Sequence, residues 1–298
     1  MAEIVECVPN FSEGREKSVI ESIVDEARKI KGVKLLDYHP DADHNRTVVT
    51  FIGNPKDVEN AAFNMTKMAS KLIDMSVHHG AHPRMGAMDV VPFIPVLGIT
   101  MDECIKMAKR TAKRIGDELG IPVYLYEEAA SIPERKNLAY IRKGQYEGFF
   151  DKIKYDEWRP DFGPQSMNVK SGATAVGARV PLVAFNVNLN TSDIEIAKAI
   201  ARKVRFIGGG LRYVKAMGLR LEERNIVQVS MNLVNYKGTS IYQAFEMVKM
   251  EAKRYGVSAI GSEIIGLVPM EALIDCAQYY LKVEDFTMNQ VLEKRMLE

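Results

Sequence analysis

Three of the five histidines in this 298-residue chain lie within five positions, at His78, His79 and His82. Pro83 disfavours the helical region for the residue before it, so we expect His82 on an extended loop. Arg84 follows, which places a titratable imidazole beside a permanent cation that suits a carboxylate. The combination predicts proton transfer on an anionic small molecule, with His82 as the candidate catalytic residue.

Two other interpretations of this stretch stay open. His82 can simply hydrogen-bond neighbouring backbone, because buried polar side chains usually find partners. A metal site is the second, since Asp41, Asp43 and His44 precede the histidines and are residue types that bind zinc or manganese. The sequence contains no HExxH or CxxC spacing, so it favours acid–base catalysis without a metal.

The composition limits the class of protein. A net charge of +1 gives no support for nucleic-acid binding. The cysteines Cys7, Cys104 and Cys276 are odd in number and far apart, which argues against a disulfide framework and fits a reducing compartment. Neither a membrane-spanning apolar run nor a signal peptide is recognisable. We therefore expect a cytoplasmic protein with no membrane or nucleic-acid partner.

Apolar periodicity predicts the elements that must position these residues. In the first half, strands are expected at 4–8, 33–38, 47–52, 90–97 and 123–126, and helices at 19–30, 55–72 and 104–119. In the second half, strands are expected at 181–188, 211–217, 226–231 and 259–265, and helices at 194–206 and 241–255. Both halves have the βαββαβ order of a ferredoxin-like fold, extended in the first half by one helix and one strand.

Between the halves, residues 131–164 are polar, aromatic and rich in proline and glycine. This composition predicts the inter-domain connection, with two short helices and with Trp158 as an anchor. The run at 208–210 is predicted to be a turn, because no Walker spacing follows its glycines. We thus expect an α+β protein of two ferredoxin-like subdomains, 1–178 and 179–298, with mixed or antiparallel sheets, helices on one face and a ligand cleft between them.

Long strings in the sequence resemble the formiminotransferase family, in the same order and over almost the whole chain. They are 5–14 (VECVPNFSEG), 44–47 (HNRT), 78–87 (HHGAHPRMGA), 161–164 (DFGP), 171–174 (SGAT), 177–179 (GAR), 184–189 (AFNVNL) and 266–269 (GLVP). The resemblance implies transfer of the formimino group from N-formimino-L-glutamate to tetrahydrofolate in histidine degradation. It also implies a homodimer, tetrahydrofolate as co-substrate with no metal and, because mammalian relatives are fused to a cyclodeaminase, a separate cyclodeaminase as partner.

The family's catalytic histidine matches His82. An imidazole of near-neutral pKa can take the proton that the folate N5 loses and return one to the departing glutamate nitrogen. The donor's two carboxylates call for cations, and Asp41 or Asp43 is expected to orient His82 or the amidinium. The expected substrate-binding residues are Arg84, Arg46, His44, Asp41 and Asn10. The roles of His39, Asp43, His78 and His79 stay open.

Folate recognition is expected from a segment that matches the family's folate-binding region and from a strand of the second half. The expected folate-binding residues are Gly163, Pro164, Ser171, Gly172, Ala173, Thr174, Asn186 and Asn188. Asn186 and Asn188 are two apart on a predicted strand, so their amides point to one face and offer the donors and acceptors that a pterin edge requires.

Other functions are compatible with the sequence. A related folate enzyme would act on 5-formyltetrahydrofolate or use N-formylglutamate as donor. Two alternatives belong to different classes, a metal-dependent hydrolase and a non-catalytic folate-binding protein.

Overall fold

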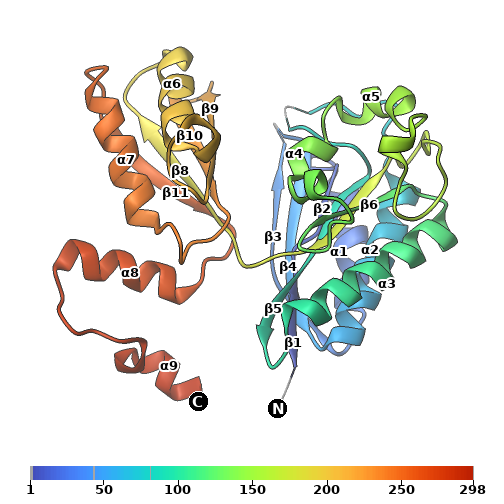
Figure 1. The fold of residues 1–298 in the computed structure, drawn as a ribbon. Helices are drawn as coiled ribbons and strands as arrows, with labels where there is room; N and C mark the ends of the chain where they lie inside the picture. Colours follow the sequence, from blue (N-terminus) through green and yellow to red (C-terminus); the bar gives the residue numbers. More distant parts are fainter. Residues whose placement is uncertain (1–2, 43, 81, 298) are drawn as a thin grey trace. The chain divides into compact units, whose positions relative to one another are not determined.

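The computed structural model describes residues 3–42, 44–80 and 82–297. The chain divides into two compact units, with the break between Arg179 and Val180 (Figure 1). Each unit has its own sheet and its own apolar core. The predicted α+β class is therefore confirmed.

A seven-stranded mixed sheet forms the centre of the first unit. Its strands are β1 (Ile4–Cys7), β2 (Asn10–Phe11), β3 (Val33–Asp41), β4 (Arg46–Gly53), β5 (Met88–Leu97), β6 (Val123–Glu127) and β7 (Thr174–Ala178). β4 pairs with both β3 and β1, and β1 pairs with β5, all antiparallel, which gives the ferredoxin-like arrangement. β7 lies parallel to and between β5 and β6.

Three helices cover one face of this sheet, α1 (Lys17–Arg28), α2 (Pro55–Leu72) and α3 (Met101–Leu119) (Figure 1). Their apolar stripes meet alternate residues of the strands, such as Cys7, Val49 and Phe93. Intervening residues such as Asn10 and Arg46 consequently belong to the other face of the sheet. The alternation of residues along each strand therefore separates the core face of the sheet from the face that contains Asn10 and Arg46.

The segment 131–164 is part of the first unit and does not connect the units, which corrects the predicted inter-domain connection. Its short helices α4 (Leu138–Ile141) and α5 (Gln145–Lys152) pack with β5, β6 and β7 on the face opposite α1–α3. Two 3-10 turns, η1 (Pro133–Lys136) and η2 (Asp156–Trp158), flank them. Trp158 is buried and stacks on Tyr140 with ring centroids 4.8 Å apart, as its predicted anchoring role requires. The prolines and glycines thus mark turns of a packed segment.

The second unit has a four-stranded antiparallel sheet in the order β11-β8-β10-β9. Its strands are β8 (Val183–Leu189), β9 (Val214–Leu221), β10 (Ile226–Leu233) and β11 (Ala259–Ile265), with α6 (Ile194–Val204) and α7 (Ile241–Lys253) packed on one face. The predicted βαββαβ order is confirmed. Gly208 ends η3 (Phe206–Gly208), and Gly209 and Gly210 form the predicted turn, with Gly209 at φ +85°.

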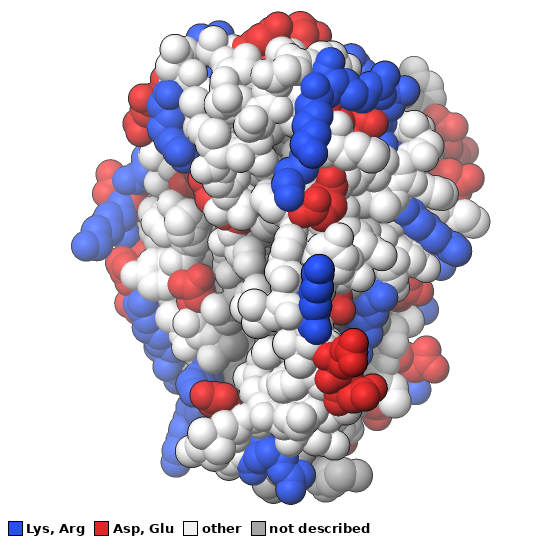
Figure 2. All heavy atoms as spheres, turned by 90° about the vertical axis from the view of Figure 1, so that its left-hand side faces the viewer, with Lys and Arg blue, Asp and Glu red and all other residues white. Residues whose placement is uncertain are grey.

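Several elements were not predicted. β2 has two residues and β7 is built from small residues, so neither gives a clear apolar alternation. Beyond β11 the chain forms α8 (Met270–Leu281), η4 (Met288–Gln290) and α9 (Leu292–Leu297). Among the described residues, no helix has the length and apolar character needed to cross a bilayer. On the face drawn in Figure 2, basic and acidic side chains are interspersed over a largely uncharged surface.

Candidate functional site

The histidine loop, residues 78–87, connects α2 to β5 beside the turn between β3 and β4. Asn45 joins the two segments, because its Nδ2 donates to the His79 carbonyl at 2.9 Å and its Oδ1 accepts from the Gly14 amide at 2.9 Å. A Cβ on Gly80 would lie 2.2 Å from the His44 carbonyl oxygen. Glycine is therefore required for this close approach of the two backbones.

His82 lies against Arg46, the first residue of β4. Arg46 Nη1 is 2.9 Å from His82 Nε2 and also donates to Asn10 Oδ1 at 3.0 Å. A guanidinium only donates, so Nε2 must accept and the imidazole is neutral with its proton on Nδ1. Nδ1 is buried and has no hydrogen-bond partner among the described residues. The structure therefore brings together three of the predicted site residues, Asn10, Arg46 and His82.

The electrostatic environment keeps His82 in its basic form. Burial, followed by the charges of Arg46 and Arg142, lowers the pKa of His82 to about 2. Burial and the charge of Arg142 also lower the pKa of Arg46 to about 10. In the free protein His82 is therefore neutral but only weakly basic, and an anion that offsets these cations would raise its proton affinity.

Asp41 and His44 form a second pair next to His82. Asp41 Oδ2 is 2.6 Å from His44 Nδ1, and Asp41 Oδ1 accepts from the His44 amide at 2.8 Å. The His44 ring meets that of His82 edge-on, with centroids 6.0 Å apart. The Asp41 carboxylate thus orients His44, and Arg46 orients His82. Asp43, the alternative orienting residue, lies outside the described residues.

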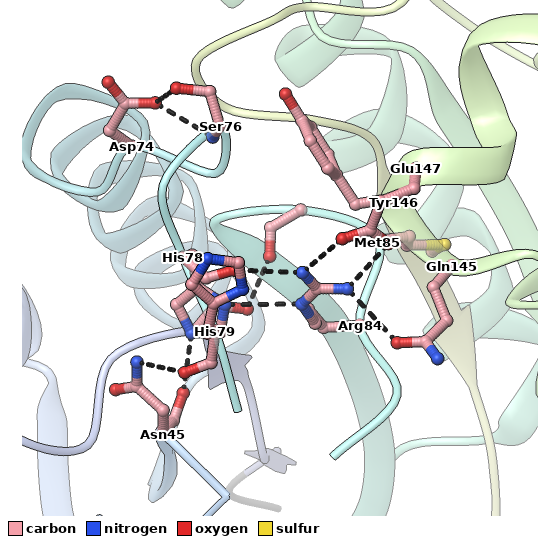
Figure 3. Close-up of polar contacts among 12 residues, drawn as sticks. Asn45, Asp74, Ser76, His78, His79, Arg84, Met85, Gln145, Tyr146 and Glu147 are labelled. Atoms are coloured by element: carbon pink, nitrogen blue, oxygen red, sulfur yellow. Dashed lines mark hydrogen bonds and ion pairs between the residues drawn. The ribbon is translucent and has the colours of Figure 1, made fainter. Parts of the chain in front are cut away.

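Arg84 anchors the loop to α5 (Figure 3). Its two Nη atoms donate to Glu147 Oε2 and Oε1 at 2.9 and 2.7 Å, and Nη1 also reaches Gln145 Oε1 at 3.1 Å. Nε and Nη2 donate to His78 Nδ1 and the His78 carbonyl at 3.3 and 3.0 Å. All five N–H groups of Arg84 are used inside the protein. A substrate carboxylate would have to displace Glu147 to bind here, and the substrate-binding role of Arg84 stays a prediction.

The remaining histidines differ in their surroundings. His78 is buried, with Nε2 3.0 Å from the Asn45 carbonyl and Nδ1 accepting from Arg84. The His79 and His39 side chains are exposed. Among the described residues, no three His, Cys, Asp or Glu side chains group so that they could hold a metal ion. His78 therefore supports the loop, whereas His82 faces the cations of the candidate site.

The predicted folate segment packs against the base of the histidine loop. Gly172 has φ +71°, and a Cβ there would lie 2.3 Å from the Met85 carbonyl oxygen. The Ala173 amide donates to Met85 and the Ser171 carbonyl accepts from Ala87, at 2.9 and 2.8 Å. Ser171, Ala173 and Thr174 are buried. In this structure, the glycine permits contact between two backbone segments.

Gly163 and Pro164 lie near the C-terminus of α3. Gly163 has φ +81°, and a Cβ there would lie 2.3 Å from the Ile121 carbonyl oxygen. Its backbone packs against Gly116 of α3. Gly163 therefore belongs to the packing around α3, apart from the contacts of His82.

Asn186 and Asn188 belong to the second unit and share one face of β8, as predicted. Asn188 Nδ2 donates to Glu263 Oε1 at 3.1 Å, and Gln228 Nε2 donates to Asn188 Oδ1 and Glu263 Oε2 at 2.8 and 3.1 Å. Asn188 and Gln228 are buried, while the Glu263 side chain is 39% exposed. This face of β8, β10 and β11 is therefore polar, opposite the apolar face that packs on α6 and α7.

The structure adds four residues that the sequence analysis did not select. Asp89 is fully buried beside the histidine loop and forms an ion pair with Arg142. Gln228 and Glu263 complete the network around Asn188. Asp89 lies two residues beyond the string 78–87, which was a usable signal. Arg142 comes from a segment whose path over the sheet has no sequence pattern.

Two family models match the chain. Residues 4–179 match "Formiminotransferase domain, N-terminal subdomain", and residues 184–297 match "Formiminotransferase domain". A glutamate formimidoyltransferase of Streptococcus pyogenes is 55% identical over the full length of both chains. One from Thermoplasma acidophilum is 50% identical, with 98% of this chain and 97% of the relative covered. The formimidoyltransferase-cyclodeaminase of Sus scrofa is 46% identical, and 97% of this chain covers 54% of that protein. The chain therefore belongs to the formiminotransferase domain family.

Proposed function

We propose that this protein transfers the formimino group of N-formimino-L-glutamate to tetrahydrofolate, giving 5-formiminotetrahydrofolate and L-glutamate. The observation that supports this most is the neutral His82, whose Nε2 lone pair faces the Arg46 guanidinium 2.9 Å away. The full-length similarity to two proteins named glutamate formimidoyltransferase agrees with it. The protein is accordingly a one-carbon group transferase.

His82 acts first as a base and then as an acid in this proposal. The folate N5 attacks the amidine carbon, and its proton passes to Nε2 of His82. The bond between that carbon and the glutamate nitrogen then breaks while His82 returns the proton to the departing nitrogen. One imidazole thus serves both transfers, which typically contributes about 10² to 10⁴ in rate. Arg46 and Asn10 hold the reacting groups in place.

The neighbouring residues have supporting roles. Asp41 and His44 form a carboxylate–imidazole pair beside His82, and we assign them to the amidinium end of the donor, where a carboxylate is the complementary charge. Arg84 orients the loop through Glu147, Gln145 and His78. Arg84 therefore contributes to the position of His82 through the loop that contains both residues.

Tetrahydrofolate is the co-substrate in this proposal, and no metal takes part. Asn186 and Asn188, with the segment from Gly163 to Thr174, are the proposed folate-binding residues. The support is chemical, since the amides on this polar sheet face present donors and acceptors together, as a pterin edge requires.

We also place the protein in the cytoplasm, as a homodimer that passes its product to a separate cyclodeaminase. Its three cysteines are free thiols, in keeping with a reducing compartment. The name of the pig relative, which this chain covers over 54%, joins the two activities. Light scattering of the purified protein measures the oligomeric state.

The deciding experiment follows glutamate release from formiminoglutamate with and without tetrahydrofolate. We expect release only with both substrates, and a loss of about 10² to 10⁴ in kcat for His82→Ala. His79→Ala, an exposed histidine of the same loop, is the matched control and keeps its rate. Faster reaction with N-formylglutamate, or with 5-formyltetrahydrofolate and ATP, would replace the donor assignment. Activity that requires added metal would indicate a hydrolase, and folate binding without any transfer would indicate a binding protein.

A further inference from the structure

Arg142 lies at the C-terminus of α4, and the fully buried Asp89 holds its side chain. Asp89 Oδ2 accepts from Arg142 Nη2, and Asp89 Oδ1 accepts from the Met85 amide at 2.9 Å. Both carboxylate oxygens are therefore used, one on the guanidinium and one on the base of the histidine loop. Arg142 is consequently fixed in relation to the loop that contains His82.

The charge of Arg142 acts on both Arg46 and His82. It lowers the pKa of both Arg46 and His82, so its charge adds to that of the Arg46 guanidinium, which contacts the imidazole. The nearby carboxylates of Asp89 and Asp41 offset part of this charge. In each arginine the Nε–H is buried and has no partner among the described residues. Buried donors and adjacent like charges cost free energy, which a bound anion would recover.

Arg84 provides a contrast within the same site. All five of its N–H groups have partners. The side-chain hydrogen bonds of Arg142 within the described part of the chain are confined to Asp89, and those of the Arg46 side chain to Asn10 and His82. The Arg142 side chain is 16% exposed, so solutes can reach it. Arg46 and Arg142 are thus the cations with donors available for a ligand.

We propose that Arg142, positioned by Asp89, forms with Arg46 the binding site for a carboxylate of the glutamyl group, and that binding withdraws Arg46 from Nε2 of His82. The inference rests on the proposed function and identifies how its site selects the donor. A carboxylate accepts two charge-assisted hydrogen bonds from a guanidinium. The lone pair of Nε2 is then free for the proton of N5. The substrate thereby activates the base that acts on it.

Both the one-carbon donor and the glutamate tail of folate contain such a carboxylate. In the donor, the α-carboxylate is attached to the same carbon as the reacting nitrogen. In folate, the p-aminobenzoyl group separates the glutamate from N5. Since the site lies beside His82, the donor is the expected occupant.

The test measures KM for each substrate in Arg142→Gln. We expect KM for formiminoglutamate to rise about 10- to 100-fold, as the loss of a charge-assisted hydrogen bond predicts, and KM for tetrahydrofolate to change less than about 2-fold. The exposed neighbour Lys143 supplies the control variant Lys143→Gln, which leaves both constants unchanged. An unchanged donor KM in Arg142→Gln would overturn the inference.

Arg142→Gln alone leaves Asp89 buried without its cation, so a second variant protects the test against misfolding. The double variant Asp89→Asn, Arg142→Gln removes both charges and retains an acceptor for the Met85 amide. It is expected to show the same rise in donor KM with normal circular dichroism. A donor KM equal to that of the wild type in this folded variant would contradict the proposal.

Two further experiments distinguish the donor carboxylate from the folate tail, and the carboxylate site from the proposed transfer reaction. With 6-methyltetrahydropterin, which lacks the glutamate tail, the effect of Arg142→Gln on donor KM persists if the donor binds here and disappears if the tail does. L-Glutamate binding, followed by calorimetry, is expected in the wild type and lost in the double variant. This second experiment tests the carboxylate site even if no formimino transfer is observed.

Discussion

Arg46 donates from Nη1 to Nε2 of His82 across 2.9 Å, so the nitrogen that must accept a proton in the proposed reaction is occupied in the free protein. This contact defines the tautomer of the imidazole and keeps it neutral. The availability of Nε2 as a proton acceptor therefore depends on any other group that binds Arg46.

The first prediction concerns the protonation of His82. Because burial and nearby cations lower its pKa to about 2, the imidazole stays neutral from pH 8 down to pH 5. Nitrogen-15 NMR of labelled histidines, with His82→Gln to assign the signal, is expected to show Nδ1–H and unprotonated Nε2 throughout. L-Glutamate is expected to raise this pKa, since it neutralises the cations. Protonation of free His82 between pH 5 and 8 would contradict the environment described.

The same lowered pKa affects stability. The unfolded chain binds a proton at His82 as the pH falls through about 6.5, whereas the folded protein does not until about pH 2. Acidification between these values therefore favours unfolding, by up to about 1.4 kcal/mol per pH unit. Urea denaturation from pH 7 to pH 4 is expected to show a steeper loss of stability in the wild type than in His82→Gln. An equal loss of stability with falling pH in the two proteins would contradict the lowered pKa of His82.

Sequence periodicity predicted both βαββαβ units, because their strands alternate regularly between an apolar core face and a second face. It also placed Asn10 just after the strand 4–8 and Arg46 just before the strand 47–52. It could not place Arg142 or Glu147, because their positions depend on how 131–164 folds back over β5, β6 and β7. The expected substrate role of Arg84 came from its position close to His82, and proximity in sequence does not reveal that Glu147 forms an ion pair with it.

Arg84 gives a prediction about loop positioning. Lysine cannot reproduce the two parallel bonds to Glu147 together with those to His78 and Gln145. Arg84→Lys is therefore expected to lower kcat about tenfold through misplacement of His82, with smaller effects on KM. Glu147→Gln is expected to act in the same direction, and Glu134→Gln, another exposed glutamate of the 131–164 segment, is the control. Unchanged kcat in Arg84→Lys would show that the loop holds His82 without this anchor.

A glycine pair separates steric from conformational requirements. Gly172 and Gly209 both have positive φ, +71° and +85°, but a Cβ on Gly172 would lie 2.3 Å from the Met85 carbonyl oxygen, while nothing lies within 4 Å at Gly209. Gly209→Ala is expected to cost about 1 kcal/mol of unfolding free energy. Gly172→Ala is expected to cost at least about 3 kcal/mol, because backbone must move. Equal costs in urea denaturation would contradict the close packing at the base of the histidine loop.

The polar network of the second unit predicts a separate effect on folate. Asn188 is held between Gln228 and Glu263, so its amide is oriented before any ligand binds, which lowers the entropic cost of binding. Asn188→Ala is expected to weaken tetrahydrofolate binding about 10-fold, the loss of roughly one hydrogen bond, and to leave KM for formiminoglutamate unchanged. Asn190→Ala, an exposed residue just beyond the same strand, is the matched control. The dissociation constants of tetrahydrofolate for the two variants can be measured by fluorescence titration. A change in donor KM with unaltered folate affinity would reverse the assignment of substrates to Asn188 and to the Arg46–Arg142 site.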